Sequence, residues 1–297
     1  MDKVSTLGAA ADLVRSGSSI AIGGFGVYGH PMAFLRQLVR SKVSGLTVMG
    51  FTSGLDIDFL CSANRVSQVE TSTVSLESFG LAPNFRRAVE AGQVKVRDYT
   101  ESMMYHRFWA ASQGLTFFPT RVPLGSDIIR YNPDLTKMNC PLTGRPYMAM
   151  SPARPQFAVF HVPYADADGN AAFPRPGAFG GIDRVMAMAA DGIILTCERI
   201  VPNEDITRLS EFLFVPGYKV LAVVEVPMGA HPGGLGDYYV NDEQHLRDYA
   251  ALAREPDMFN KYLDRYVYGC PDHQQYLETV GASRVLAIHT GEGVRAL

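Results

Sequence analysis

The sequence has few cysteines, and no two of them have a recognisable spacing. The 297 residues include four, and none lies in a C-x-x-C pair. This scattering argues against a zinc ribbon and against a disulfide framework, so we expect no metal site and a cytoplasmic location. The four positions are Cys61, Cys140, Cys197 and Cys270.

Long apolar runs are also missing. No window reaches the ~18 apolar residues that a membrane-spanning helix needs, so we expect no membrane partner. Residues 1–16 are predicted to form an amphipathic helix rather than a secretory signal peptide. The apolar stripe of that helix consists of Leu7, Ala10, Ala11 and Val14.

The chain lacks a strong excess of either charge. Its formal net charge is −3 and its pI is near 6.2. A nucleic-acid-binding protein would present a basic face, so no nucleic-acid partner is expected. The helical His-x-x-x-His spacing of a zinc site is absent as well. With 47% hydrophobic and 19% charged residues, the composition is that of an ordinary globular protein with a sizeable core.

The most informative stretch that the sequence does contain is 18–31, SSIAIGGFGVYGHP. It predicts a short buried strand at 19–22, a glycine-rich turn, and a helix that begins at 29–31. Glycines in such a turn permit φ > 0 and let a ligand approach the main chain. The helix N-terminus behind the turn offers unpaired N–H groups and a partial positive charge. We therefore expect this turn to bind a phosphate or a developing oxyanion.

The glycine spacing of the turn fits two other interpretations, a dinucleotide site and simple close packing. Gly24, Gly26 and Gly29 have the glycine spacing of a dinucleotide-binding fingerprint. That fingerprint needs an acid after the next strand, and none follows the strand predicted at 46–49, so a nicotinamide site is disfavoured. In the simplest alternative the glycines serve only close packing.

Strands alternate with helices along the chain, and no internal repeat is present. This alternation predicts an α/β fold with a mainly parallel sheet and helices on both faces, in one domain of residues 1–297. Residues 125–155 have little periodicity and are predicted as a long loop or excursion. Residues 241–281 are predicted to be mainly helical. Strands are expected at 19–22, 46–49, 94–97, 157–162, 193–196, 220–224 and 284–288, and helices at 56–63, 83–91, 100–111 and 182–190.

The glycine-rich stretch resembles the first signature of the α subunits of class I coenzyme A transferases. The matching positions are Gly17, 20–25, Gly29 and Pro31, while Ser16 stands where the family usually has Asp or Asn. Further similarity to α-subunit landmarks occurs at 81–88, 114–119, 165–170, 196–201 and 227–232. Together with the tail at 272–282, the pattern is most similar to the glutaconate type.

The resemblance implies a three-layer α/β/α fold and an active site shared with a separate β subunit, in a heterodimer or heterotetramer. In this family the acyl-CoA thioester is attacked by a glutamate of the β subunit. The Ser-Glu-Asn-Gly motif that bears this glutamate is absent here, and we interpret the nearest acid, Glu77, as a surface or loop residue. The substrates implied are an acyl-CoA thioester and a carboxylic acid, with no permanently bound cofactor.

The resemblance implies that this chain contributes the glycine turn to the active site. The N–H groups of Gly24 and Phe25 are expected to face the acyl oxygen. Thr52 or Ser53, at the end of a strand where open α/β sheets bind ligands, is a candidate oxyanion donor, and a simple turn is the equal alternative. The residues expected to line the substrate site are Gly23, Gly26, Gly29, His30, Thr52, Ser53 and Gly54.

Glu101 departs from the transferase pattern. It falls in the first turn of the helix that Thr100 caps, where transferase α subunits commonly have Gln, Asn or Gly. An acid there resembles the ring-opening hydrolase branch of the family, which acts on CoA thioesters of steroid-ring fragments with a carboxylate as general base. The alternative is that Glu101 only complements the helix dipole. Two other functions thus stay open: an acyl-CoA or carbon–carbon bond hydrolase, and a binding or regulatory protein without chemistry.

The histidines have competing interpretations. His30 either faces an acyl carboxylate or is a solvated loop residue, and the sequence favours neither. His161 ends a buried strand and is predicted to be a hydrogen-bonded core histidine. His231 is expected in a structural turn near the cleft. His106 is not at the i+4 position from Glu101, so these two side chains are not predicted to pair.

Overall fold

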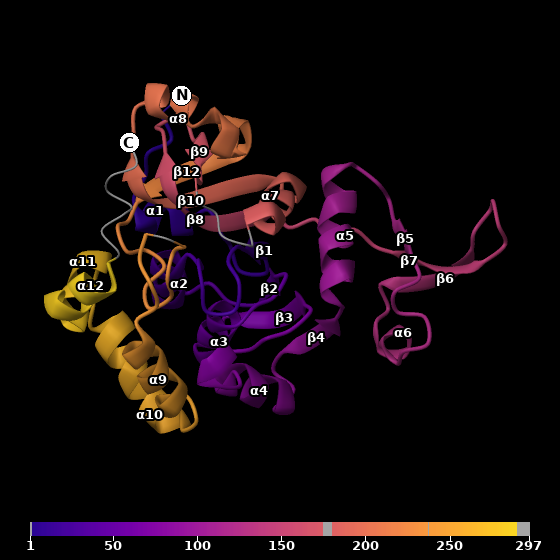
Figure 1. Cartoon of the computed structure of the whole chain (residues 1–297). Coiled ribbons are helices and arrows are strands. Elements are labelled where there is room, and N and C mark those ends of the chain that lie inside the picture. The colour runs from indigo at the N-terminus through magenta and orange to yellow at the C-terminus, as the bar shows by residue number, and fades with distance from the viewer. Residues whose placement is uncertain (1, 175–179, 237, 290–297) are drawn as a thin grey trace.

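The computed structural model describes residues 2–174, 180–236 and 238–289, and a long sheet runs through its centre (Figure 1). The parallel strands of this sheet are β1 Ser19–Ile22, β2 Leu46–Met49, β3 Val66–Thr71, β4 Lys95–Asp98, β8 Phe157–Ala165, β10 Gly192–Ile200 and β12 Val220–Glu225. Their spatial order is β12–β10–β8–β1–β2–β3–β4. The glycine turn therefore leaves the middle of the sheet, at the carboxyl end of β1.

Two short strands extend the sheet in the antiparallel sense. β9 Ala171–Ala172 pairs with the end of β8, and β11 Leu213–Val215 pairs with β9. The prediction of a mainly parallel α/β sheet is confirmed. The sequence did not indicate β3, because polar Ser67, Gln68 and Glu70 occupy half of that strand.

Two clusters of buried side chains, one on each face of the sheet, form most of the core. Side chains alternate between the faces along a strand, so Ile20 and Ile22 of β1 join one cluster and Ala21 joins the other. The result is the predicted α/β/α layering. The first face is covered by α1 Leu7–Ala11, α2 Met32–Arg40, α3 Leu55–Ser62 and α4 Pro83–Glu90, and the second by α5 Glu101–Ser112 and α7 Gly180–Ala189.

Helix α5 begins where the sequence predicts, because the Thr100 hydroxyl accepts a hydrogen bond from the N–H of Met103 at 3.2 Å. Met103, Met104 and Phe108 bury one side of the helix against the sheet. The cap and this packing fix the first turn of α5, and with it Glu101, at the carboxyl edge of the strands.

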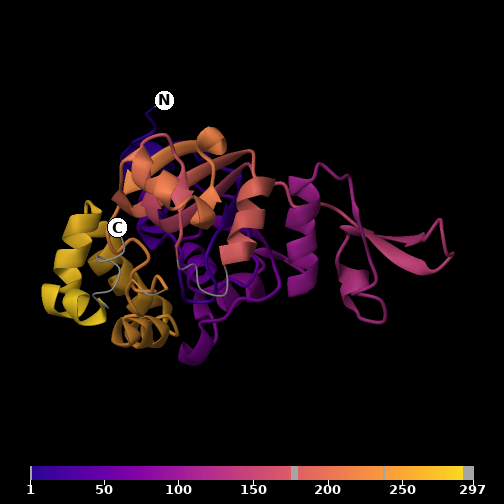
Figure 2. The ribbon, with the colours of Figure 1, turned by 45° about the horizontal axis from the view of Figure 1, so that its top comes forward.

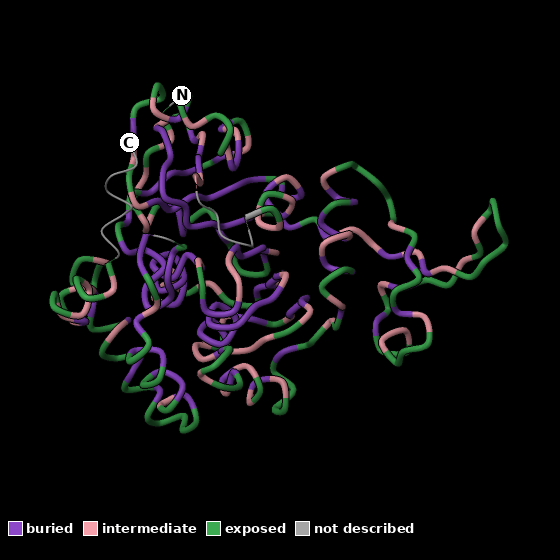
Figure 3. Tube along the Cα trace, viewed as in Figure 1, coloured by how far each residue is buried: buried purple, intermediate pink, exposed green. Residues whose placement is uncertain are grey.

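A small second sheet projects from the body beside α5 (Figures 1 and 2), and its strands mix exposed, intermediate and buried residues (Figure 3). Residues 125–155, predicted as a long loop or excursion, form an excursion that contains a helix and two strands, so the loop alternative is wrong for much of this segment. Met148 and Met150 are buried in the apolar cluster on the second face of the main sheet. This packing stabilises regular secondary structure in the segment. Its elements are β5 Phe118–Thr120, α6 Ile128–Tyr131, β6 Leu135–Asn139 and β7 Pro146–Met150, with β7 pairing antiparallel to both β5 and β6.

The C-terminal part is helical, as predicted, and packs beside α2 (Figure 1). The strand expected at 284–288 is wrong, because these residues belong to a helix. Val285 and Ile288 lie three residues apart and reach the same apolar cluster, which suits a helix and not a strand. The elements are α9 Glu243–Leu252, α10 Pro256–Leu263, the π-helical η5 Asp264–Tyr268, α11 His273–Val280 and α12 Ala282–Ile288.

The first residues are less helical than predicted. Of the described residues 2–16, only those of α1 are helical, while Val4 pairs with Val223 beside β12. No helix in the described ranges is long and apolar enough to cross a membrane. The remaining helical elements are α8 Asn203–Arg208 and the short 3-10 turns η1 Glu77–Phe79, η3 Ser210–Phe212 and η4 Gly217–Lys219.

Candidate active site

The glycine turn forms a tight reversal at the carboxyl end of β1. Phe25 N–H donates to the carbonyl of Tyr28 at 2.9 Å, and Tyr28 N–H donates back to Phe25 at 2.8 Å. Gly24, Gly26 and Gly29 have φ of +102°, +60° and +68°. Only glycine adopts such angles without strain, so these three glycines are required by the path of the backbone.

The N–H groups of Gly24, Phe25 and Gly26 have partners within the protein. The Gly26 N–H donates to the carbonyl of Thr52 at 3.0 Å, and the Phe25 N–H is committed to the reversal itself. The Gly24 N–H faces the carboxyl of Asp183, with 3.2 and 3.3 Å to the two oxygens. Of the two predicted oxyanion donors, only Gly24 thus has an N–H directed away from the turn, and the role predicted for Phe25 has no support in this geometry.

The N-terminus of α2 is not open to a ligand as the sequence suggested. The helix begins at Met32, and its Ala33 N–H donates to the carbonyl of Gly229 at 2.8 Å. The Gly29 N–H donates to Gly234 at 2.8 Å. The segment 226–235 therefore covers this helix end and braces the glycine turn from behind.

His30 fits neither of its predicted interpretations. Its side chain is buried, with Nδ1 at 2.7 Å from the carbonyl of Gly23 and Nε2 at 3.0 Å from that of Gly26. Asp56 Oδ1 lies 3.6 Å from the same Nε2 and also accepts the Gly54 N–H at 2.8 Å. His30 thus holds together the two ends of the turn and is a positioning residue rather than a substrate ligand.

Residues 52–54 lie beside the turn, as predicted. The carbonyl of Gly26 accepts the N–H of Leu55, the first residue of α3, at 2.9 Å. A Cβ on Gly54 would lie 2.1 Å from the Ser75 carbonyl oxygen and 2.4 Å from that of Gly26. Ser53 is buried, and its backbone pairs with Thr73 and Ser75 at 3.1 and 3.0 Å. Position 54 therefore requires glycine because the backbone packs too closely there for a side chain. The Ser53 side chain points into the protein rather than toward solvent.

Thr52 connects the turn to Glu101. Its hydroxyl donates to Glu101 Oε1 at 2.9 Å, while its carbonyl accepts the Gly26 N–H. Thr52 is buried and Glu101 is exposed. The Glu101 carboxylate therefore lies at the protein surface, at the carboxyl edge of the sheet beside the glycine turn. His106 bonds to the Ser102 carbonyl at 2.6 Å and not to Glu101, as the spacing predicted.

Two further acids lie against the glycine turn. Asp183 is half-buried as a residue, and burial of its carboxyl raises the pKa to about 7, although the Gly24 N–H acts in the opposite direction. Glu77 is exposed as predicted, yet its Oε1 would be 2.2 Å from a Cβ placed on Gly26. With Glu101, the structure gathers three carboxyl groups around one turn.

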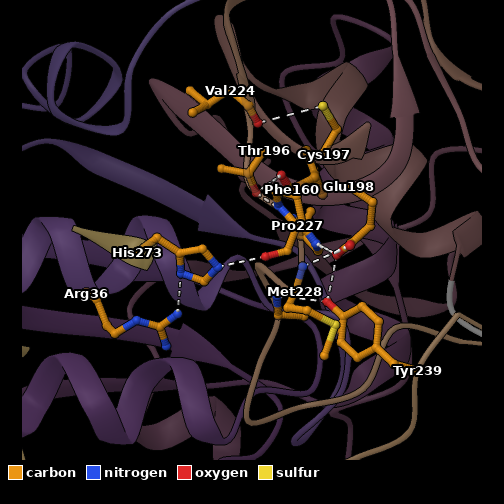
Figure 4. Close-up of polar contacts among 12 residues, drawn as sticks. Arg36, Phe160, Thr196, Cys197, Glu198, Val224, Pro227, Met228, Tyr239 and His273 are labelled. Atoms are coloured by element: carbon orange, nitrogen blue, oxygen red, sulfur yellow. Dashed lines mark hydrogen bonds and ion pairs between the residues drawn. The ribbon is translucent and has the colours of Figure 1, made fainter. Parts of the chain in front are cut away.

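Behind the turn, Glu198 anchors the bracing segment 226–235. Its carboxylate lies 2.6 Å from Nε2 of His161 and accepts the Tyr239 hydroxyl at 2.9 Å and the Met228 N–H at 2.8 Å (Figure 4). Met228 has φ +61°, an unfavourable angle for a side chain of this kind, and the bond to Glu198 helps to hold it. His161 is buried and hydrogen-bonded, which confirms its predicted structural role.

Arg36 of α2 ties the same segment to the C-terminal helices. Its guanidinium donates to the carbonyl of His231 at 2.9 Å and to Nδ1 of His273 at 3.2 Å, and lies 3.5 Å from the Tyr276 ring centroid. The other nitrogen of His273 donates to the Pro227 carbonyl at 2.7 Å (Figure 4). Burial lowers the pKa of His273 to about 3, so the ring is neutral and meets one donor and one acceptor.

One group of side chains in the described ranges has the composition of a metal site. His231, Asp242 and His245 offer ligand atoms within 4.8 Å of one another. Both nitrogens of His231 are already engaged, by Tyr276 at 2.7 Å and Asp242 at 3.2 Å. Arg284 lies 3.0 Å from Asp242 and already neutralises that carboxylate. The group is therefore best described as a buried junction between segment 226–235 and the C-terminal helices.

The sequence missed Asp183 and Glu198 as parts of this region. Asp183 reaches Gly24 from 159 positions away, a distance that no local pattern spans. A signal existed for Glu198, since an acid that follows a buried parallel strand lies at the edge where such sheets bind ligands.

Comparisons with known proteins agree with this geometry. The coenzyme A transferase family model matches residues 4–226. The chain is 30% identical to a glutaconate CoA-transferase subunit from Acidaminococcus fermentans over 99% of this chain and 97% of that protein. It superposes on the crystal structure of that enzyme with a TM-score of 0.92 at 29% identity, covering 97% of this chain and 95% of that chain.

Two other relatives are similar over most of this chain. The IpdA subunit of a cholesterol ring-cleaving hydrolase from Rhodococcus jostii is 34% identical over 92% of this chain and 95% of that protein. An uncharacterized protein of Archaeoglobus fulgidus is 36% identical over 94% of this chain, which spans only 62% of that protein's length. The family match and the near-complete superposition confirm the resemblance seen in the sequence. The chain is a member of the coenzyme A transferase family.

Proposed function

We propose that this chain is the α subunit of a heteromeric CoA-transferase, which moves coenzyme A between an acyl-CoA and a carboxylic acid. Its substrate is the coenzyme A thioester itself, and no permanently bound cofactor is required. A partner β subunit supplies the nucleophilic glutamate, and this chain supplies the glycine turn. The whole chain, 1–297, acts as one α-subunit domain.

One observation carries the proposal: a glycine turn at the carboxyl edge of β1 whose Gly24 N–H meets a side chain rather than the backbone of the turn, in a chain without the nucleophile motif. When the partner carboxylate adds to the thioester carbonyl, negative charge develops on the acyl oxygen. A backbone N–H aimed at that oxygen stabilises the charge. The similarity to a glutaconate CoA-transferase subunit supports a small dicarboxylic acyl group as substrate.

A cytoplasmic location belongs to the same proposal. All four cysteines are free thiols in the structure, and a reducing compartment keeps thiols in that state.

The proposal predicts that the isolated chain exchanges no acyl group and that the co-purified complex does. Acetyl-CoA and glutaconate are incubated in heavy-oxygen water with the chain alone and with the complex, and both thioesters and acids are analysed by mass spectrometry. Glutaconyl-CoA formed only by the complex, with acetate free of solvent label, supports transfer. Full exchange by the isolated chain, or none by the complex with any acyl-CoA of a panel, contradicts it.

Hydrolysis is the second candidate, and the contact between Glu101 and Thr52 is the observation behind it. A carboxylate held at the rim of the site by a hydroxyl is placed to act as a general base toward water or a substrate carbon. The similarity to a ring-cleaving hydrolase subunit supports the same idea. In that case solvent oxygen enters the released acid.

Glu101→Gln separates the two candidates. A hydrolase that uses Glu101 as base should lose roughly 10²–10⁴ in kcat, because a general base contributes that much. A transferase should keep kcat within about tenfold, since the nucleophile lies on the partner. Glu243→Gln is the matched control, because Glu243 is also an exposed first-turn acid, on α9. An equal loss in both variants would show a helix-dipole effect and remove Glu101 from the mechanism.

A further inference from the structure

The Asp183 carboxyl lies against the N–H of Gly24, which no backbone carbonyl of the turn accepts. Its two oxygens lie 3.2 and 3.3 Å from the Gly24 nitrogen, so the carboxyl straddles the donor. A Cβ on Gly23 would lie 3.3 Å from Asp183 Oδ2 and 2.2 Å from the Phe160 ring. The turn is thus pressed between β8 and the first turn of α7, and Asp183 covers the position that an acyl oxygen would take.

Among the described residues, this carboxyl accepts its hydrogen bond from the Gly24 N–H, and no cationic side chain pairs with it. A desolvated aspartate without a cationic partner is costly when ionised. Asp58, by contrast, is buried but receives bonds from Asn84, Phe85 and Tyr249. The isolation of Asp183 suggests a role other than holding the fold.

Neighbouring ionisable groups do not set its titration. Helix α7 packs against α5, β8 and β11. The pKa of Asp183, raised to about 7, is determined by burial and by the Gly24 N–H, with no charged side chain of the described residues contributing. The ionisable groups of those packed elements are Glu101, Tyr105, His106 and Arg107 on α5 and His161 and Tyr164 on β8.

We propose that Asp183 is a positioning residue that holds the Gly24 N–H when ionised and releases it to the acyl oxygen of the thioester when protonated. The inference rests on the proposed function in one respect, namely that the acyl oxygen is the second acceptor of this N–H. Protonation takes one proton from solvent and forms the O–H bond of the carboxylic acid; the Gly24 N–H then exchanges one acceptor for another, and no other covalent bond forms or breaks. An ionised carboxyl would both compete for the donor and repel the developing oxyanion.

The first test observes the contact itself and needs no activity. It uses NMR on the complex with only glycine labelled, with ¹³C at the carbonyl carbon and ¹⁵N at the amide nitrogen. A signal that requires a labelled carbonyl bonded to a labelled nitrogen then comes only from glycines that follow another glycine. These are Gly24, Gly181 and Gly234. Gly181→Ala removes one signal, since a Cβ there meets no atom within 4 Å. We expect the chemical shift of the Gly24 amide to change with pH, with a midpoint near pH 7, in the native chain. In Asp183→Asn the same chemical shift should not depend on pH.

The second test measures kcat/KM for acyl exchange by the complex between about pH 5 and pH 9. The pH dependence of kcat/KM reports ionisations of the free enzyme. We expect the native enzyme to lose about tenfold per pH unit above about pH 7, and Asp183→Asn to stay level, so that the variant is roughly 100-fold faster at about pH 9. Asp191→Asn, an exposed aspartate that follows the end of the same helix, should keep the native profile.

The outcomes separate the two proposals. A Gly24 amide that does not titrate overturns the role of Asp183, whatever the activity. An Asp183→Asn variant that is slower by one factor at every pH also overturns it, because Asp183 would then only support the turn. A complex that exchanges no acyl group while the Gly24 amide titrates as expected contradicts the proposed function and leaves the link between Asp183 and Gly24 intact.

Discussion

Replacing Glu198 by alanine should lower the free energy of unfolding by about 3 kcal/mol, because the change leaves buried polar groups without their acceptor. The groups affected are the Met228 N–H, the Tyr239 hydroxyl and Nε2 of His161, all within 2.9 Å of the carboxylate. Since the entropy of unfolding is about 2.1 cal/mol/K per residue, the loss corresponds to a fall in Tm of roughly 5 °C for a chain of 297 residues. Differential scanning calorimetry of the complex measures it.

Glu225→Ala is the matched control for Glu198→Ala. Glu225 ends the neighbouring strand β12, is exposed, and accepts one backbone N–H, that of Ile200 at 2.6 Å. Its loss should cost no more than about 1 kcal/mol. If the two variants unfold at the same temperature, the network around Glu198 does not stabilise the fold, and its role as anchor of segment 226–235 is wrong.

The sequence predicted the central part of the site well, because that part is local. Strand β1, the glycine turn and helix α2 follow from a short buried run, positive-φ glycines and an apolar helical stripe within 18–40. The neighbouring position of 52–54 follows from parallel strands that end at the same edge. Short-range patterns of this kind determine backbone path and element order.

The partners of the turn could not be predicted, because each comes from a distant segment. The Gly24 N–H meets Asp183, and the Gly29 N–H meets Gly234, contacts that depend on how layers pack. His30 illustrates the same limit. Its loop position suggested exposure, whereas tertiary packing buries it between two carbonyl groups of the turn.

Two of the errors in secondary structure have a related cause. Residues 284–288 and 125–155 each carry short apolar patterns that fit more than one element. In the first, contact with the cluster around Leu277 selects a helix. In the second, burial of Met148 and Met150 beside α5 selects a strand. In both cases the packing surface, and not the local propensity, decides.

Replacing Gly24 by alanine should abolish acyl exchange, with a loss of at least about 10²–10³ in kcat/KM, the usual effect of removing one oxyanion donor. At φ +102° an alanine is strained, and its Cβ would lie 2.5 Å from the Tyr28 carbonyl oxygen and 2.8 Å from the His30 backbone nitrogen. Because these are backbone atoms, the turn must open to make room. Opening turns the Gly24 N–H away from the acyl oxygen.

Gly29→Ala separates this steric effect from backbone strain. Gly29 lies in the same turn with φ +68°, but a Cβ there meets only Gly24 Cα, at an ordinary 3.7 Å. The variant should lose about 1–2 kcal/mol of stability and keep most of its kcat/KM. Gly17→Ala, just before β1, measures the cost of backbone strain alone. Gly17 has φ +81°, and a Cβ there would meet no atom within 4 Å. Steady-state exchange and thermal unfolding are measured on all three complexes. If Gly24→Ala and Gly29→Ala lose equal activity, strain in the turn is sufficient to explain the loss, and the outward N–H of Gly24 is not the group that stabilises the oxyanion.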